Sequence, residues 1–126
     1  MIRIHLTSEV SDQAQVGNET QIWHQAHVRE GAKLGRNCIL GKGVYVDFDV
    51  QIGSHCKLQN GATVYQGAAL GDGIFAGPRA ILANDRLPGA INPNGSLKSD
   101  AGCEIGRINV KRGASLGAGS IILPVD

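Results

Sequence analysis

An aliphatic residue recurs at every sixth position along most of this chain, and that period restricts the fold more than any other feature. Counting in steps of six from Ile4 to Leu82 gives fourteen positions, of which thirteen are Ile, Leu or Val and one is Ala76. The residue four positions after each of them is nearly always small. A period of six excludes an amphipathic α-helix, whose period is 3.6 residues. It is typical of short strands and tight turns that repeat at a fixed interval.

Glycine follows the same period. Of the 18 glycines, fourteen fall at only two phases, directly after the aliphatic residue or three positions after it, and the other four lie in 89–106. Glycine adopts positive φ without a steric penalty, so we predict a tight turn in every repeat. The aliphatic and small residues then point inward, and three sides of six residues close a triangular coil. The expected fold is all-β, a parallel β-helix whose coils stack about 4.8 Å apart.

The repeat also divides the chain. A single β-helix domain, 1–126, is expected to hold its main coils in 1–82 and its final partial coils in 110–126. The pattern is absent from 83–109, which is polar and rich in Gly, Pro, Asn and Asp. We interpret this segment as one loop excursion, and long ordered loops usually carry function or an interface.

Composition narrows the function. The net charge is +1, and no run of Lys and Arg exceeds two residues, which does not favour nucleic acid or an anionic membrane as a partner. No apolar run reaches 18 residues and no signal peptide is evident, so we expect a cytoplasmic protein. Cys38 and Cys56 stand 18 residues apart at the small inward phase, where buried thiols are expected, and Cys103 lies in the excursion.

A metal site is not expected. The histidines are His5, His24, His27 and His55, and no two have the His-x4-His spacing that the zinc-dependent γ-type carbonic anhydrases of this fold require. The three cysteines have no metal-ligand spacing either. We therefore expect neither a zinc enzyme nor a disulfide framework.

Several segments go beyond the generic repeat: TQIWHQAHV (20–28), KLQNGATVY (57–65), GPRAILAND (77–85), INPNGSLKSD (91–100) and VKRGASLGAGSIILP (110–124). Together they resemble the bacterial sugar-nucleotide N-acetyltransferases of the hexapeptide-repeat acyltransferase superfamily. The resemblance implies a left-handed coil and a homotrimer with active sites between subunits. It also implies acetyl transfer from acetyl-CoA to the 3-amino group of a nucleotide-linked amino sugar, in O-antigen and lipopolysaccharide biosynthesis.

The sequence departs from these relatives in two places. They read Pro-Arg-Ala after the Asn-Asp pair, where this chain has Pro88-Gly89-Ala90, so one arginine is missing. They also continue past Leu123-Pro124 with coils that help to line the acetyl-CoA channel, whereas this sequence ends at Asp126. We expect a C-terminally shortened member. The alternative is a catalytically impaired relative that acts as a trimeric sugar-nucleotide-binding or structural module.

Two residues are the candidate catalytic groups. The resemblance places Asn84 beside the sugar amine, where an amide accepts a hydrogen bond and orients the nitrogen lone pair. His24 could take the proton released as the amine attacks. The alternatives are that Asn84-Asp85 begins a turn and that His24 is a surface or inter-subunit histidine.

Other polar residues are candidates for binding. Outward columns at a spacing of 18 should bring together His24, Lys42 and Asn60, and beside them Trp23, Gly41, Gln59 and Gly77. The predicted residues for the nucleotide sugar are Gln59, Asn60, Tyr65, Arg79, Asp85 and Arg86, since Arg suits a diphosphate and Tyr can stack on a base. For acetyl-CoA they are Lys111, Arg112 and Gly117. For each of these the alternative is a solvated coil surface.

Overall fold

The computed structural model describes residues 1–86, 88–99 and 105–124, and no helix occurs in these ranges. Its strands are two or three residues long and form three parallel sheets. Sheet A contains β1 (Arg3–Ile4), β4 (Gln21–Ile22), β7 (Ile39–Leu40), β10 (Lys57–Leu58), β13 (Phe75–Ala76) and β16 (Ser115–Leu116). Sheet B contains β2 (Glu9–Val10), β5 (His27–Val28), β8 (Tyr45–Val46), β11 (Thr63–Val64), β14 (Ile81–Leu82) and β17 (Ile121–Ile122). Sheet C contains β3 (Gln15–Val16), β6 (Lys33–Leu34), β9 (Gln51–Ile52), β12 (Ala68–Leu70) and β15 (Ile108–Val110).

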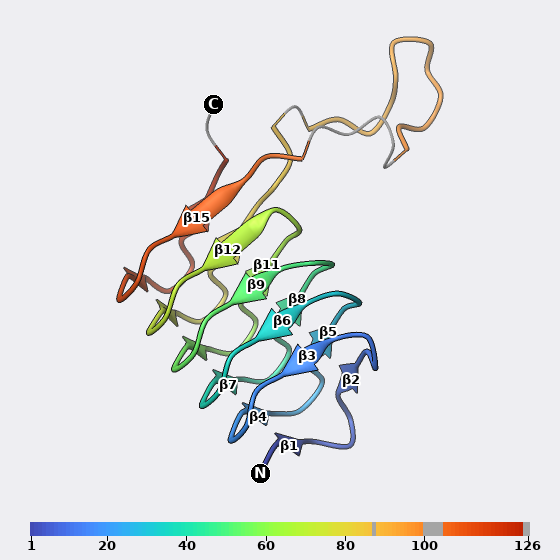
Figure 1. Cartoon of the computed structure of the whole chain (residues 1–126). Coiled ribbons are helices and arrows are strands. Elements are labelled where there is room, and N and C mark those ends of the chain that lie inside the picture. Colours follow the sequence, from blue (N-terminus) through green and yellow to red (C-terminus); the bar gives the residue numbers. More distant parts are fainter. Residues whose placement is uncertain (87, 100–104, 125–126) are drawn as a thin grey trace.

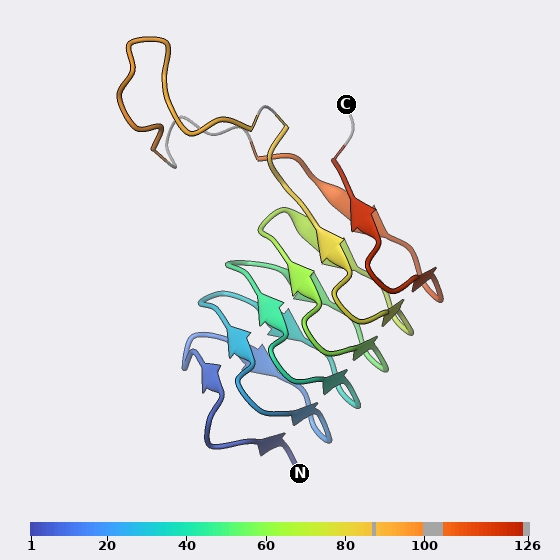
Figure 2. The same ribbon diagram turned by 180° about the vertical axis from the view of Figure 1, so that it is seen from behind.

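The chain visits the three sheets in turn, so successive strands of one sheet lie 18 residues apart through most of the stack. Figures 1 and 2 show the coils stacked along one axis and winding in a left-handed sense. Parallel strands joined this way break the usual right-handed crossover rule, which the very short strands and tight corners allow. The predicted left-handed parallel β-helix is confirmed.

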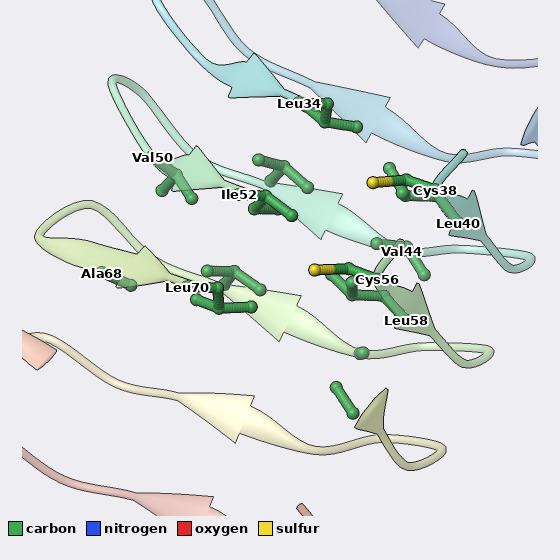
Figure 3. Close-up of a cluster of buried hydrophobic side chains, with 14 of the residues drawn as sticks. Leu34, Cys38, Leu40, Val44, Val50, Ile52, Cys56, Leu58, Ala68 and Leu70 are labelled. Atoms are coloured by element: carbon green, nitrogen blue, oxygen red, sulfur yellow. The ribbon is translucent and has the colours of Figure 1, made fainter. Parts of the chain in front are cut away.

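The interior is a set of stacked rows. Leu34, Ile52 and Leu70 are each 4% exposed and follow one another through sheet C, as Figure 3 shows. Val16 continues the row at the N-terminal end, where it is half-buried. Cys38 lies next to Cys56 in the adjacent coil, and both are fully buried as predicted. A hydrogen bond with the Cys38 thiol, together with burial, raises the pKa of Cys56, so this thiol stays protonated.

The two groups of glycines have different structural roles. Those three positions after the aliphatic residue have positive φ, for example 79° at Gly31 and 75° at Gly61. Non-glycine residues at the same corner position adopt φ between 57° and 64°, Arg79 among them. The glycines directly after the aliphatic residue instead allow close approach of the next coil, except Gly117 in the last described coil. A Cβ on Gly17 would lie 2.5 Å from the carbonyl carbon of Gly35 in the next coil.

The excursion leaves the coils after β14. Its described part contains the antiparallel bridges Asp85 to Ile105 and Ile91 to Leu97, and Figure 1 shows it standing away from the stack. The coil resumes at Ile108, two residues before the six-residue pattern resumes at Val110, because β15 pairs Ile108 with Ala68. Cys103 and the last two residues of the final partial coils lie outside the described residues.

We predict that Gly35→Ala destabilises the protein by about 1–3 kcal/mol, because the new methyl group would overlap the backbone of the next coil. Its Cβ would lie 2.7 Å from both the Gly53 carbonyl carbon and the Ser54 nitrogen. Gly117→Ala is the matched control, since it has the same phase and nothing within 4 Å of the added Cβ. Urea unfolding measures both, and equal midpoints would contradict the close-approach explanation.

Candidate functional site

The prism has three corners, and each predicted site residue lies at or beside one of them. The A–B corner, between sheets A and B, comprises 5–8, 23–26, 41–44, 59–62, 77–80 and 117–120. The B–C corner comprises 11–14, 29–32, 47–50 and 65–67, and the excursion begins there after β14. The C–A corner comprises 17–20, 35–38, 53–56, 71–74 and 111–114.

The structure divides the predicted residues among these corners. At the B–C corner are Tyr65, Asn84, Asp85 and Arg86, and at the A–B corner are His24, Gln59, Asn60, Arg79 and Gly117. Lys111 and Arg112 lie at the C–A corner, where both are exposed. One chain therefore does not bring together all the residues that sequence reasoning assigned to one reaction.

Asn84 is half-buried and held on two sides. Its Nδ2 donates to the Gln66 carbonyl oxygen of the preceding coil at 3.0 Å. Its own carbonyl accepts from the Gly106 N–H at 2.6 Å, where the excursion returns to the coils. Because the amide nitrogen is used by the protein, Oδ1 is the atom of this side chain that is suited to accept a hydrogen bond from a bound ligand.

Asp47, which was not among the residues predicted from the sequence, stabilises the same B–C corner from an earlier coil. Its side chain is buried, with the residue 8% exposed. Oδ1 accepts from the Tyr45 hydroxyl at 3.0 Å and from the Phe48 N–H at 2.8 Å. Oδ2 accepts from the Gln66 N–H at 2.9 Å. A buried carboxylate with three donors fixes the backbone of the residue whose carbonyl receives Asn84.

Arg29 completes this network. Its guanidinium donates to the Tyr45 hydroxyl at 3.2 Å and lies 4.0 Å from the centre of the Phe48 ring. Burial, followed by the hydrogen bond to Asp47, raises the pKa of Tyr45 above its usual range. The Tyr45 hydroxyl therefore stays protonated and can donate to Asp47. Tyr65 extends the cluster outward, with its ring 6.0 Å from that of Tyr45.

A cavity of about 410 Å³ lies at this corner, and Gln66, whose carbonyl accepts the Asn84 hydrogen bond, is among its lining residues. Its lining comes from sheet C, the B–C corner and the returning excursion, and consists of Asp49, Gln51, Gln66, Gly67, Ala68, Ala69, Ile105, Arg107 and Asn109. None of these residues was predicted as part of a site. One signal was present, because Ala69 interrupts an outward row of longer polar residues formed by Gln15, Lys33, Gln51 and Asn109.

Asp85 and Arg86 continue from Asn84 into the excursion. Asp85 is exposed and forms the backbone bridge to Ile105. Arg86 lies against Gly106, where an added Cβ would stand 2.8 Å from the Arg86 Cγ. These two residues therefore border the returning segment, which bonds to the Asn84 carbonyl through Gly106.

The A–B corner carries a second hollow. His24, Lys42 and Asn60 follow one another at a spacing of 18, beside Trp23, Gly41 and Gln59, as the outward columns predicted. With Ile39 and Leu58 these six residues line a hollow of about 300 Å³. Asn60 Oδ1 accepts from the Lys42 N–H at 2.9 Å, so its amide group is fixed by the preceding coil, as that of Asn84 is.

Three rings lie together at the N-terminal end of this hollow. The rings of His5 and His24 stack with their centres 3.6 Å apart. The indole of Trp23 lies 6.3 Å from the His24 ring, with the planes 10° apart. Trp23 remains 46% exposed, which leaves much of its surface open to a ligand.

His24 and Asn84 are far apart in one chain. His24 precedes strand β5 of sheet B, whereas Asn84 follows strand β14 of the same sheet. The two residues therefore lie beyond opposite ends of the strands and three coils apart along the axis. Three coil spacings alone amount to roughly 14 Å, and the width of a sheet adds to this distance. The two candidate catalytic side chains therefore cannot contact one substrate group from within a single chain.

In the described part of the chain, no three His, Cys, Asp or Glu side chains are grouped so that they could hold a metal ion. The same ranges contain no helix of the length and hydrophobicity needed to cross a membrane.

Comparison with known proteins defines the class. Residues 13–47 match the family described as bacterial transferase hexapeptide (six repeats). Serine acetyltransferase from Bacillus licheniformis is 35% identical over 97 residues, which cover 76% of this chain and 39% of that protein. A histidine-to-alanine variant of GDP-perosamine N-acetyltransferase from Caulobacter crescentus, solved with CoA and GDP-perosamine, has a TM-score of 0.58. It is 17% identical, and the match covers 98% of this chain and 45% of that one.

The chain thus spans less than half the length of these two proteins. Its fold and repeats define a β-helical protein of the hexapeptide class. Its sequence and fold fit the superfamily of hexapeptide-repeat acyltransferases.

We predict that Asp47→Asn destabilises the protein by about 1–3 kcal/mol. The amide NH₂ of Asn would replace a carboxylate oxygen and would face an N–H or hydroxyl group that also donates, so that donor would lose its acceptor. The Gln66 amide should exchange its hydrogen faster, since it loses the bond to Oδ2. Asp49→Asn is the matched control, because Asp49 is exposed and Asn tolerates its φ of 58°. Chemical unfolding and hydrogen exchange test this, and equal protection of Gln66 in both variants would contradict the role of Asp47.

Proposed function

We propose that this protein transfers an acetyl group from acetyl-CoA to the amino group of a nucleotide-linked amino sugar. The single observation that carries the proposal is the tethered amide of Asn84, which donates to the carbonyl of Gln66, a residue that lines a cavity of about 410 Å³. The match to the bacterial transferase hexapeptide family supports acyl transfer, and the solved neighbour that binds CoA and GDP-perosamine supports an amino-sugar nucleotide as acceptor.

Asn84 acts by orientation. Its Oδ1 accepts one N–H of the neutral sugar amine, and this directs the nitrogen lone pair at the thioester carbonyl. The new C–N bond forms as the C–S bond breaks, and the departing CoA thiolate ends as a thiol with the proton that the amine loses. No covalent enzyme intermediate is needed, and backbone N–H groups at a coil corner can stabilise the oxyanion that develops.

The proposed site uses two chains. His24, the candidate acceptor of the amine proton, lies at a different corner from Asn84, so it joins Asn84 only from a neighbouring copy. A three-sided prism suits threefold packing, and we propose a homotrimer with a site at each junction. Lys111 and Arg112 are the proposed contacts for CoA phosphates, with Gly117 beside the acyl channel. We place the reaction in the cytoplasm, where thiols such as Cys38 and Cys56 remain reduced.

We predict that Asn84→Ala lowers kcat by roughly 100-fold, with a much smaller effect on KM, because it removes an orienting contact to the reacting nitrogen. Asn18→Ala, at an exposed position of the C–A corner, is the control and should leave kcat unchanged. Acetylation of UDP- and dTDP-linked amino sugars, followed by thiol release from acetyl-CoA, measures both. An unchanged kcat in the Asn84 variant would remove Asn84 from the reaction.

We also predict that mixed assemblies of His24→Ala and Asn84→Ala recover activity that neither variant has alone. In randomly mixed trimers about a quarter of the junctions would combine an intact His24 with an intact Asn84. Co-refolding of the two variants, compared with each refolded alone, measures this gain. If the mixture is as inactive as its parts, the two residues do not share a site between chains.

The opposing hypothesis is a catalytically impaired sugar-nucleotide-binding or structural module. Titration of the chain with acetyl-CoA by calorimetry separates the two: micromolar affinity favours the enzyme, and no binding favours the module. Transfer to L-serine in place of an amino sugar would keep acyl transfer but overturn the proposed acceptor.

A further inference from the structure

The A–B corner differs from the other two corners in its charge. None of its residues is acidic, and none of the strands of sheet A contains an acidic residue. The described B–C corner coils carry Asp12, Glu30, Asp47 and Asp49, and the C–A corner carries Glu19 and Asp72. Cations occur at all three corners, so the A–B corner is distinguished by its lack of acidic residues and not by an excess of basic ones.

Cations line this acid-free surface. Lys42 is exposed and borders two adjoining hollows, one of about 300 Å³ with Trp23 and Asn60 and one of about 350 Å³ with Thr7 and Gln25. Arg3 borders a third, of about 450 Å³, on the other side of Trp23. A concave surface lined by one sign of charge raises the local concentration of ligands of opposite charge.

The same hollows meet at an aromatic platform. Trp23 borders the hollow that contains Lys42 and the hollow that contains Arg3. Its half-exposed indole, with His24 stacked on His5 beside it, offers a flat π-surface, and Gly41 leaves the space next to it open. Such a surface is suited to a planar ring, and stacking of a base on an aromatic side chain contributes about 1–3 kcal/mol per base.

We propose that this groove, defined by Trp23, His24, Gly41, Lys42, Gln59 and Asn60, binds a nucleoside diphosphate. The base stacks on Trp23, the diphosphate lies against Lys42, and the amide groups of Gln59 and Asn60 offer hydrogen bonds to the sugar. The inference rests on the proposed function, because both co-substrates of that reaction carry a nucleoside diphosphate.

Trp23 makes the groove directly observable, because it is the only tryptophan in the chain. Titration with UDP, dTDP and 5′-ADP should quench its fluorescence to saturation in at least one case. Quenching by UDP or dTDP alone assigns the groove to the nucleotide sugar, and quenching by 5′-ADP alone assigns it to CoA. Both outcomes support a nucleoside diphosphate site. If none of the three quenches at millimolar concentration, the inference is overturned.

Two variants separate the parts of the site. Lys42→Ala should weaken binding of the active nucleotide about tenfold, the loss of one charge-assisted contact, while the free nucleoside is unaffected. Lys33→Ala, an exposed lysine on sheet C, removes the same charge outside the groove and should change nothing. Equal weakening in both variants would show a general charge effect and overturn the assigned site.

Trp23→Ala, followed by calorimetry because the fluorophore is lost, should weaken binding at least fivefold. In acetyl-transfer assays it should raise the KM for the co-substrate that carries the bound nucleotide and leave kcat nearly unchanged. Normal transfer with an unchanged KM would overturn the groove and keep the proposed function. Saturable quenching in a protein that acetylates no amino-sugar nucleotide would keep the groove and overturn the proposed function.

Discussion

The hydrogen-bond ladder between successive coils is the constraint on which the rest of the structure depends. The N–H of a strand residue donates to a carbonyl in the following coil, as Lys33 does to Val50 at 2.9 Å and Lys57 does to Ile74 at 2.9 Å. In the regular coils the register is 18 residues, so equivalent side chains stack directly above one another. Rows of one residue type therefore follow from the backbone, and a change in one coil is felt mainly by its two neighbours.

This ladder also explains why polar side chains can serve as structural parts. Ser54 Oγ accepts from the Arg36 N–H at 3.1 Å, and Asp72 Oδ1 accepts from the Ser54 N–H at 2.7 Å. Each stands 18 residues after the group it satisfies. Asn60 does the same for Lys42 and has a second amide atom to offer. Short polar side chains at the corners thus satisfy backbone groups that are not paired within the strands. Asn60 and Asn84, two of the residues proposed to bind ligand, are among these side chains.

The periodic part of the molecule was predictable from the sequence because one side-chain position repeats with the backbone. The interior row through Leu34 and Ile52, the paired burial of Cys38 and Cys56 and the outward column of His24, Lys42 and Asn60 all follow from counting residues. The site around Asn84 does not. Its bond to Gln66 depends on a corner that Asp47 fixes, and its contact with Gly106 depends on the return of a segment with no period. In the sequence, Asp47 cannot be told from other polar corner residues. Its role follows only from the positions of Tyr45 and Arg29 in the structure.

The excursion after Leu82 has a consequence for how such a protein can diversify. Within the stack, gain or loss of a single residue would rotate every later side chain out of its row, so length there can change without damage only by a whole coil. Between β14 and β15 no such count applies, and this segment ends beside Asn84 and Arg107. Insertions and deletions in that interval can change the lining of one cavity, to which Ile105 and Arg107 contribute, while the coils keep their order.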